Sequence, residues 1–141
     1  MTEHDVRHVV RGRRGQALVE LALVLPVILL LVVGMLEFSR AWNLHQALTD
    51  ATREGARRAA VADSKMDSQD SVRAAVWRGL SQAGYFPQHA GAGYSVTIAS
   101  SGGVWKKTGD NVTIDVRFPY RFWVLPFRDI TMRSTFTMRY E

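Results

Sequence analysis

One long apolar window dominates the N-terminal third of the chain. In residues 17–36, fourteen of the twenty side chains are Leu, Ile or Val, and Glu20 is the one charged residue. A helix of this length spans about 30 Å, the thickness of the hydrocarbon core of a bilayer. The apolar side chains favour insertion by about 4 to 8 kcal/mol, whereas an acid near the end of a span costs at most about 3 kcal/mol. The window therefore predicts a membrane-spanning helix.

Small and apolar residues continue beyond this window at helical spacing. They recur every three or four residues and form one stripe: Ala41, Leu44, Leu48, Ala51, Gly55 and Ala59. Oppositely charged pairs such as Glu54 with Arg57 fall outside the stripe, as expected for a solvated face. We therefore expect one helix over residues 16–62. The stripe needs a partner, which we expect to be first the chain's own head and then other subunits. The candidate subunit contacts on it are Leu44, Leu48, Ala51 and Gly55.

The rest of the chain changes from helical to alternating periodicity. A second helix is expected over residues 68–83, stopped by Gly84, and a loop over residues 87–93. Alternation then predicts three strands, over residues 94–98, 112–118 and 130–140, and a weaker fourth over residues 104–107. The fold class expected is α+β: a long N-terminal transmembrane helix continues into a small exported head with a second helix and a three- or four-stranded antiparallel sheet.

A conspicuous aromatic and aliphatic loop is expected between the last two strands, at residues 119–127. It has three possible roles: packing in the core, resting on the membrane surface as an aromatic anchor, or contacting another subunit. Phe122 and Trp123 are the candidate contact residues for the last role.

The charge distribution orients the predicted span. The chain of 141 residues carries 18 Lys and Arg against 13 Asp and Glu, and four of the arginines, including Arg13 and Arg14, precede the window. Positive charge before a span keeps that end in the cytoplasm. We therefore expect a single-pass protein of the plasma (inner) membrane with an extracytoplasmic head. A cleaved signal peptide is disfavoured, because the window is too long and no small-residue cleavage site follows it.

The residues just before the window form a motif. Arg13 and Arg14 precede Gly15, and Glu20 follows Gly15 by five positions. This arrangement resembles the processing site of type IV prepilins, which a prepilin peptidase cuts after the glycine. The chain is most similar to the TadE-like family of the tight-adherence (Tad/Flp) pilus, through GQALVELALVLP, EFSR and ATREGARR up to about residue 62, and again through ITMRSTFTMRYE at the end. Leu21 stands where the major Flp pilins usually carry Tyr, which is typical of the pseudopilin-like members.

The resemblance implies a function in the assembly or export of Tad/Flp pili. It implies cleavage between Gly15 and Gln16, and pairing of Glu20 with the new N-terminal amine of a neighbouring subunit. The alternative for Glu20 is that it snorkels to the interface without a role. The partners implied are the membrane, prepilin peptidase, the major Flp pilin, companion pseudopilins, the Tad platform proteins and a secretion ATPase. The predicted parts are a cytoplasmic leader (1–15), the transmembrane and stalk helix (16–62) and the head (63–141).

Several functional classes are disfavoured by the sequence. The chain has no Cys and no metalloprotease, hydrolase or nucleotide-binding motif, so we expect no enzyme activity, metal or cofactor. The arginines of residues 53–58 are spaced to pair with Asp50 and Glu54, and no aromatic residues interleave with them, so no nucleic-acid partner is expected. The main rival is a membrane-anchored extracytoplasmic binding module for an anionic ligand that does not polymerise. A weaker rival is a secreted protein released by ordinary signal peptidase.

Overall fold

The computed structural model describes residues 3–61, 69–101, 109–124 and 128–140, with side chains from residue 15 onward except at residues 89 and 92. The chain divides into two compact units, residues 1–38 and residues 39–141. The first unit consists of the N-terminal part of helix α1. The second contains the rest of α1 and all of the other elements. The predicted connection at residues 63–67 and the weak strand at residues 104–107 lie outside the described residues.

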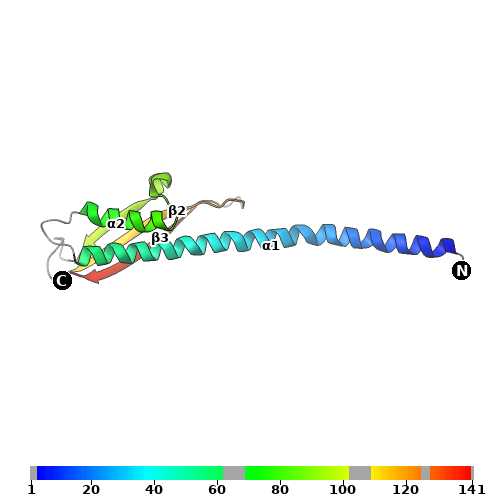
Figure 1. Ribbon diagram of the computed structural model, residues 1–141, viewed down its shortest axis with the longest axis horizontal. Coiled ribbons are helices and arrows are strands. Elements are labelled where there is room, and N and C mark those ends of the chain that lie inside the picture. The colour runs from blue at the N-terminus through cyan, green and yellow to red at the C-terminus, as the bar shows by residue number, and fades with distance from the viewer. Residues whose placement is uncertain (1–2, 62–68, 102–108, 125–127, 141) are drawn as a thin grey trace. The chain divides into compact units, whose positions relative to one another are not determined.

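Helix α1 runs from Glu3 to Ala60 and continues through Pro26 (Figure 1). It begins before residue 16, where the sequence placed its start, because that boundary was suggested by the cleavage motif and not by a break in the helical pattern. Helix α1 ends at Ala60, two residues before the expected end at residue 62. Within the described part of the chain, α1 is the one helix long and apolar enough to cross a membrane. Its apolar side chains are exposed here, Leu23 by 72% and Met35 by 70%, as expected for a helix whose natural surroundings are lipid.

Helix α2, Gln69–Gln82, buries the face that the periodicity predicted, with Val72, Val76 and Leu80 fully covered. It ends at Gln82, shortly before the expected stop at Gly84, whose φ of 86° lies in the left-handed region. The Tyr85 amide donates to the Leu80 carbonyl at 2.9 Å, which satisfies an exposed carbonyl of the last turn. Two short 3₁₀ helices, Pro87–His89 and Gly91–Gly93, occupy the segment expected to be a loop.

Three antiparallel strands form the sheet in the order β1-β2-β3: Ser95–Ser100, Asn111–Tyr120 and Ile130–Arg139. The register pairs Ile98 with Ile114, and Ile114 with Phe136. The prediction that the loop begins at Pro119 was wrong, because β2 continues to Tyr120. The β1 pairing stops at Arg117, so β2 pairs only with β3 at Pro119, where a missing N–H is tolerated.

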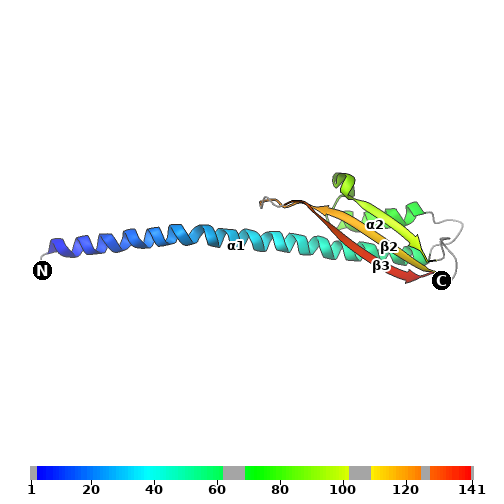
Figure 2. The ribbon, with the colours of Figure 1, turned by 180° about the vertical axis from the view of Figure 1, so that it is seen from behind.

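The core of the head lies between the sheet and the two helices, which lie on the same face of it (Figures 1 and 2). Alternate β2 side chains face the helices and are buried: Val112, Ile114, Val116, Phe118 and Tyr120. The other sheet face is polar, and Asp115 there accepts hydrogen bonds from Arg133, from Thr135 at 2.8 Å and from Arg117 at 3.2 Å. Burial raises the pKa of Asp115. The hydrogen bonds together lower the pKa by more than burial raises it, so the pKa of Asp115 lies below its usual value. The α+β architecture predicted from the sequence is confirmed.

Candidate functional site

The predicted processing motif, residues 13–20, lies within α1. Gly15, Gln16 and Glu20 are exposed, and a Cβ added at Gly15 would meet nothing within 4 Å. Arg13 and Arg14 lie in the same helix, and their side chains are outside the description. A peptidase that cuts after Gly15 has to open the helix locally. Glycine lowers the cost, because it destabilises a helix interior by about 1 kcal/mol relative to alanine.

Gln16 and Glu20 are four residues apart in this helix, so they lie on the same side of it. A chain that begins at Gln16 would carry its α-amino group one helical turn from the Glu20 carboxylate. An α-amine has a pKa of about 7.7 to 8.0 and is largely protonated at neutral pH. A protonated amine at Gln16 would then lie on the same side of α1 as the Glu20 side chain.

The small-residue stripe is covered by the head itself. Leu44, Leu48 and Ala51 are at most 2% exposed. A Cβ at Gly55 would lie 2.5 Å from a Val76 methyl group, so α1 and α2 approach closely at this point. The first of the two partners expected for the stripe, the chain's own head, therefore accounts for the burial of these residues. Their role in contacts between subunits stays a prediction.

The opposite face of this part of α1 is solvated. Arg57 donates hydrogen bonds of 2.9 and 2.7 Å to the Glu54 carboxylate. These bonds lower the pKa of Glu54, with smaller contributions from the neighbouring arginine charges. The ion pairing inferred from the spacing is present, at an exposed position where it contributes little to stability.

The described part of the 119–127 segment combines core and surface positions. Tyr120 is buried, and its ring meets that of the partly buried Phe122 edge to face, with 5.1 Å between centroids. Trp123 is 82% exposed and Val124 is 63% exposed. Core packing, the first of the three expected roles, therefore holds for Tyr120 and Phe122 but not for Trp123 and Val124. Residues 125–127 lie outside the described residues.

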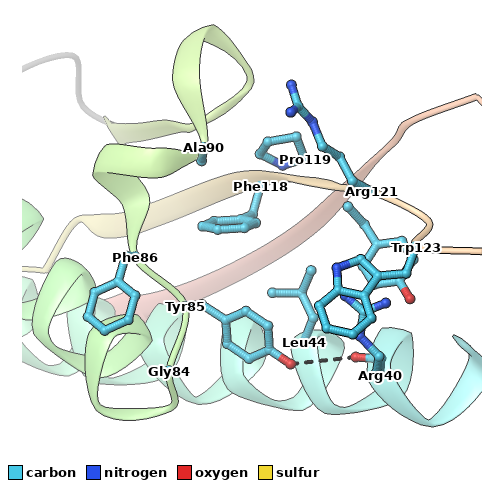
Figure 3. A pocket seen from close by; sticks show the side chains of 11 residues that line it. Arg40, Leu44, Gly84, Tyr85, Phe86, Ala90, Phe118, Pro119, Arg121 and Trp123 are labelled. Carbon is cyan, nitrogen blue, oxygen red and sulfur yellow. Dashed lines mark hydrogen bonds between the residues drawn. The ribbon is translucent and has the colours of Figure 1, made fainter. Parts of the chain in front are cut away.

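Trp123 lies at the rim of a cavity of about 310 Å³ in the head (Figure 3). The cavity is lined by side chains from α1, from the segment after α2 and from the end of β2: Arg40, Leu44, Tyr85, Phe86, Phe118, Pro119, Tyr120, Arg121 and Trp123, with Gly84 and Ala90. The Arg40 guanidinium lies 4.5 Å from the centre of the Trp123 ring and 5.7 Å from that of Tyr120. Both distances are within the range of cation–π attraction.

Tyr85 connects this cavity to the backbone of α1. Its hydroxyl donates to the Arg40 carbonyl at 3.5 Å (Figure 3). Burial raises the pKa of Tyr85, and the Arg40 charge lowers it by less. The hydroxyl therefore stays protonated at neutral pH and remains a donor.

The sequence did not identify this cavity. Arg40 was visible as the first basic residue after the apolar window, and Trp123 as part of an aromatic loop, but nothing linked them to Tyr85. The cavity combines aromatic walls with guanidinium groups, a chemistry suited to binding an anionic or amphipathic group rather than to proton transfer. Among the described residues, no group of three or more His, Asp or Glu side chains is placed to hold a metal ion.

The comparisons with known proteins concern the N-terminal part of the chain. A family model described as TadE-like protein matches residues 15–57, which begin at the glycine of the processing motif and end near the end of α1. No curated protein and no solved structure matches the chain. The match confirms the resemblance to the TadE-like family over this helix.

Proposed function

We propose that this protein is a TadE-like pseudopilin that takes part in the assembly or export of Tad/Flp type IV pili after its leader is cleaved between Gly15 and Gln16. One observation carries the proposal: Gly15, which follows Arg13 and Arg14, is the first residue of the segment that matches TadE-like proteins, and Glu20 lies in that segment at the start of an exposed apolar stretch of α1. In this proposal the leader is cytoplasmic, α1 crosses the inner membrane once and the head lies outside the cytoplasm.

Glu20 would set the register of the subunit in the assembly. An isolated carboxylate in hydrocarbon is costly and tends to become protonated, whereas a nearby cation favours the charged form. Cleavage supplies such a cation at Gln16. Because the amine and the carboxylate lie on one side of α1, two neighbouring helices displaced along their axes bring the amine of one chain to the carboxylate of the other.

The partners follow from this function. Prepilin peptidase would remove the leader, and the major Flp pilin, companion pseudopilins and Tad platform proteins would be the neighbours of the mature chain. Since the stripe on α1 is covered by the head, the exposed apolar side chains of residues 18–36 are the surface that we assign to these contacts.

Substitution of Glu20 tests the proposal. Glu20→Ala removes the carboxylate without changing the cleavage motif, and Leu23→Ala is a matched control at another exposed position of the same helix. We expect both variants to be processed and to accumulate in the membrane, and only Glu20→Ala to lose pilus output in the native host. Normal piliation with Glu20→Ala would contradict the register role and favour a membrane-anchored binding module.

A further inference from the structure

The exposed end of the head carries apolar side chains that its own core leaves uncovered. Trp123 and Val124 follow the end of β2 and are 82% and 63% exposed. Ile130, which pairs with Tyr120 at the start of β3, is 44% exposed, and Phe86 at the cavity is 46% exposed. Large apolar side chains gathered in this way on a small domain mark a surface that contacts something other than water.

The chain itself keeps this surface near the end of the apolar window. Arg40 follows residue 36 by four positions. Four residues span about 6 Å in a helix and about 14 Å even when fully extended. The Trp123 ring lies 4.5 Å from the Arg40 guanidinium. Trp123 is therefore within reach of the headgroup layer of any membrane that residues 17–36 cross, which is the region that tryptophan prefers.

The charges around Trp123 complement an anionic surface. Arg40 and Arg121 line the cavity beside it, and Arg128 is exposed a few residues farther along the chain. Asp129 offsets one of these charges through an ion pair with Arg121, with 3.2 Å between Nε and Oδ2. Each basic residue near an anionic leaflet contributes about 1 kcal/mol of attraction.

We propose that residues 120–124 and Arg40, hereafter the tip, form a membrane-surface anchor that binds anionic phospholipid headgroups. Trp123 enters the interface, and Arg40 and Arg121 contact the lipid phosphates. Arg40 keeps its place against the Trp123 ring, so the cation and the aromatic group enter the headgroup layer as one unit. This proposal requires that α1 spans a membrane, and it does not depend on leader cleavage or on pilus assembly.

Depth-dependent quenching of tryptophan fluorescence tests this anchor in the full chain. The three other tryptophans (Trp42, Trp77 and Trp105) are replaced by Phe, and the protein is placed in nanodiscs that contain brominated phosphatidylcholine. The control keeps Trp77 as the one tryptophan. Trp77 is in α2, near the positions where Gly79 and Val76 meet Ala51 and Gly55 of α1. Ala51 lies about 16 Å farther along α1 than Arg40. Thermal unfolding of both variants verifies that the head is folded.

We expect Trp123 to lose about half or more of its fluorescence to the brominated lipid and to shift to shorter wavelength, while Trp77 changes little. Adding about one third of phosphatidylglycerol should increase the Trp123 quenching, and Arg121→Gln should reduce that increase. Arg78→Gln, at an exposed position of α2, is the matched control and should leave the effect of phosphatidylglycerol on Trp123 quenching unchanged.

Two results would overturn the inference. Quenching of Trp123 no greater than that of Trp77 would show that the tip stays in water, which would leave it as a contact for another subunit. Quenching that is independent of phosphatidylglycerol and of Arg121 would refute the binding of anionic headgroups. Neither result would bear on the pseudopilin proposal, since loss of pilus output with Glu20→Ala is measured separately.

Discussion

Replacing Gly55 by alanine tests whether the stripe on α1 is a contact within the head. Gly55 lies inside α1, before its last turn, where an alanine normally stabilises a helix by about 1 kcal/mol. Here the new Cβ would lie 2.5 Å from Cγ2 of Val76, whereas carbon atoms in ordinary contact are about 3.5 to 4.0 Å apart.

The surroundings of Val76 leave it little freedom to move away. It is fully buried, and its β-branched side chain has one strongly preferred rotamer in a helix. The methyl groups of Ile114 and Val72 lie 3.8 and 4.0 Å from the same point. Overpacking of this kind costs about 1 to 3 kcal/mol. After the helix gain is subtracted, Gly55→Ala should destabilise the head by up to about 2 kcal/mol.

The assay is thermal unfolding of the full chain in detergent, followed by near-ultraviolet circular dichroism, which reports on the packing of the head. For a domain of this size each kcal/mol lowers Tm by about 4 to 8 °C. Gly34→Ala is the control, because a Cβ there meets nothing within 4 Å, and it should leave Tm unchanged or raise it.

A double mutant provides the decisive comparison. Val76→Ala removes the methyl group that Gly55→Ala would strike, so in that background Gly55→Ala should become neutral or stabilising. The reasoning is refuted if Gly55→Ala raises Tm in the wild-type background, or if its effect is the same in both backgrounds.

Three further predictions concern the head. Asp115→Asn should cost about 1 to 2 kcal/mol at neutral pH, because it weakens charge-assisted hydrogen bonds to partly exposed arginines such as Arg133. Since folding lowers the pKa of Asp115, this stabilisation is present above the unfolded pKa of about 3.9 and is lost as the pH falls through the folded pKa. In chemical unfolding between pH 7 and pH 3, the difference in the free energy of unfolding between wild type and Asp115→Asn should therefore shrink as the pH falls. Phe122→Ser should lower Tm measurably, whereas Trp123→Ser should leave it nearly unchanged, because only Phe122 packs against the core. Gly84→Ala should destabilise by about 1 to 2 kcal/mol in the same measurement, because alanine at a φ of 86° is strained; no loss of Tm would contradict the helix stop.

The parts of the fold that depend on local periodicity could be predicted from the sequence. The buried face of α2, its stop at Gly84 and the alternation along the strands are all properties of neighbouring residues. Pro119 misled the prediction because proline normally ends a strand. The structure accepts it where β2 no longer pairs with β1, and packs it against Gly93, where a Cβ would lie 2.9 Å from the Pro119 Cβ. That arrangement depends on where two strands stop pairing, which no local pattern records.

The candidate sites also differ in how far local sequence could predict them. The motif around Gly15 and Glu20 is contiguous, so its spacing could be read directly. The cavity joins Arg40, Tyr85 and Trp123, which are about forty residues apart from one to the next and meet only through tertiary packing. The spacing of the stripe on α1 was also visible, but it was compatible with two partners. The close approach of α1 and α2 at Gly55 accounts for it within one chain.

The most direct test of the central claim is the N-terminus of the mature protein. Mass spectrometry of the membrane-bound protein, from cells with and without prepilin peptidase, measures it without any substitution in the chain. The pseudopilin account predicts a chain that starts at Gln16 and, in the absence of the peptidase, a chain that keeps residues 1–15. An identical, uncleaved N-terminus in both strains would contradict the account and leave a membrane-anchored protein with a different function.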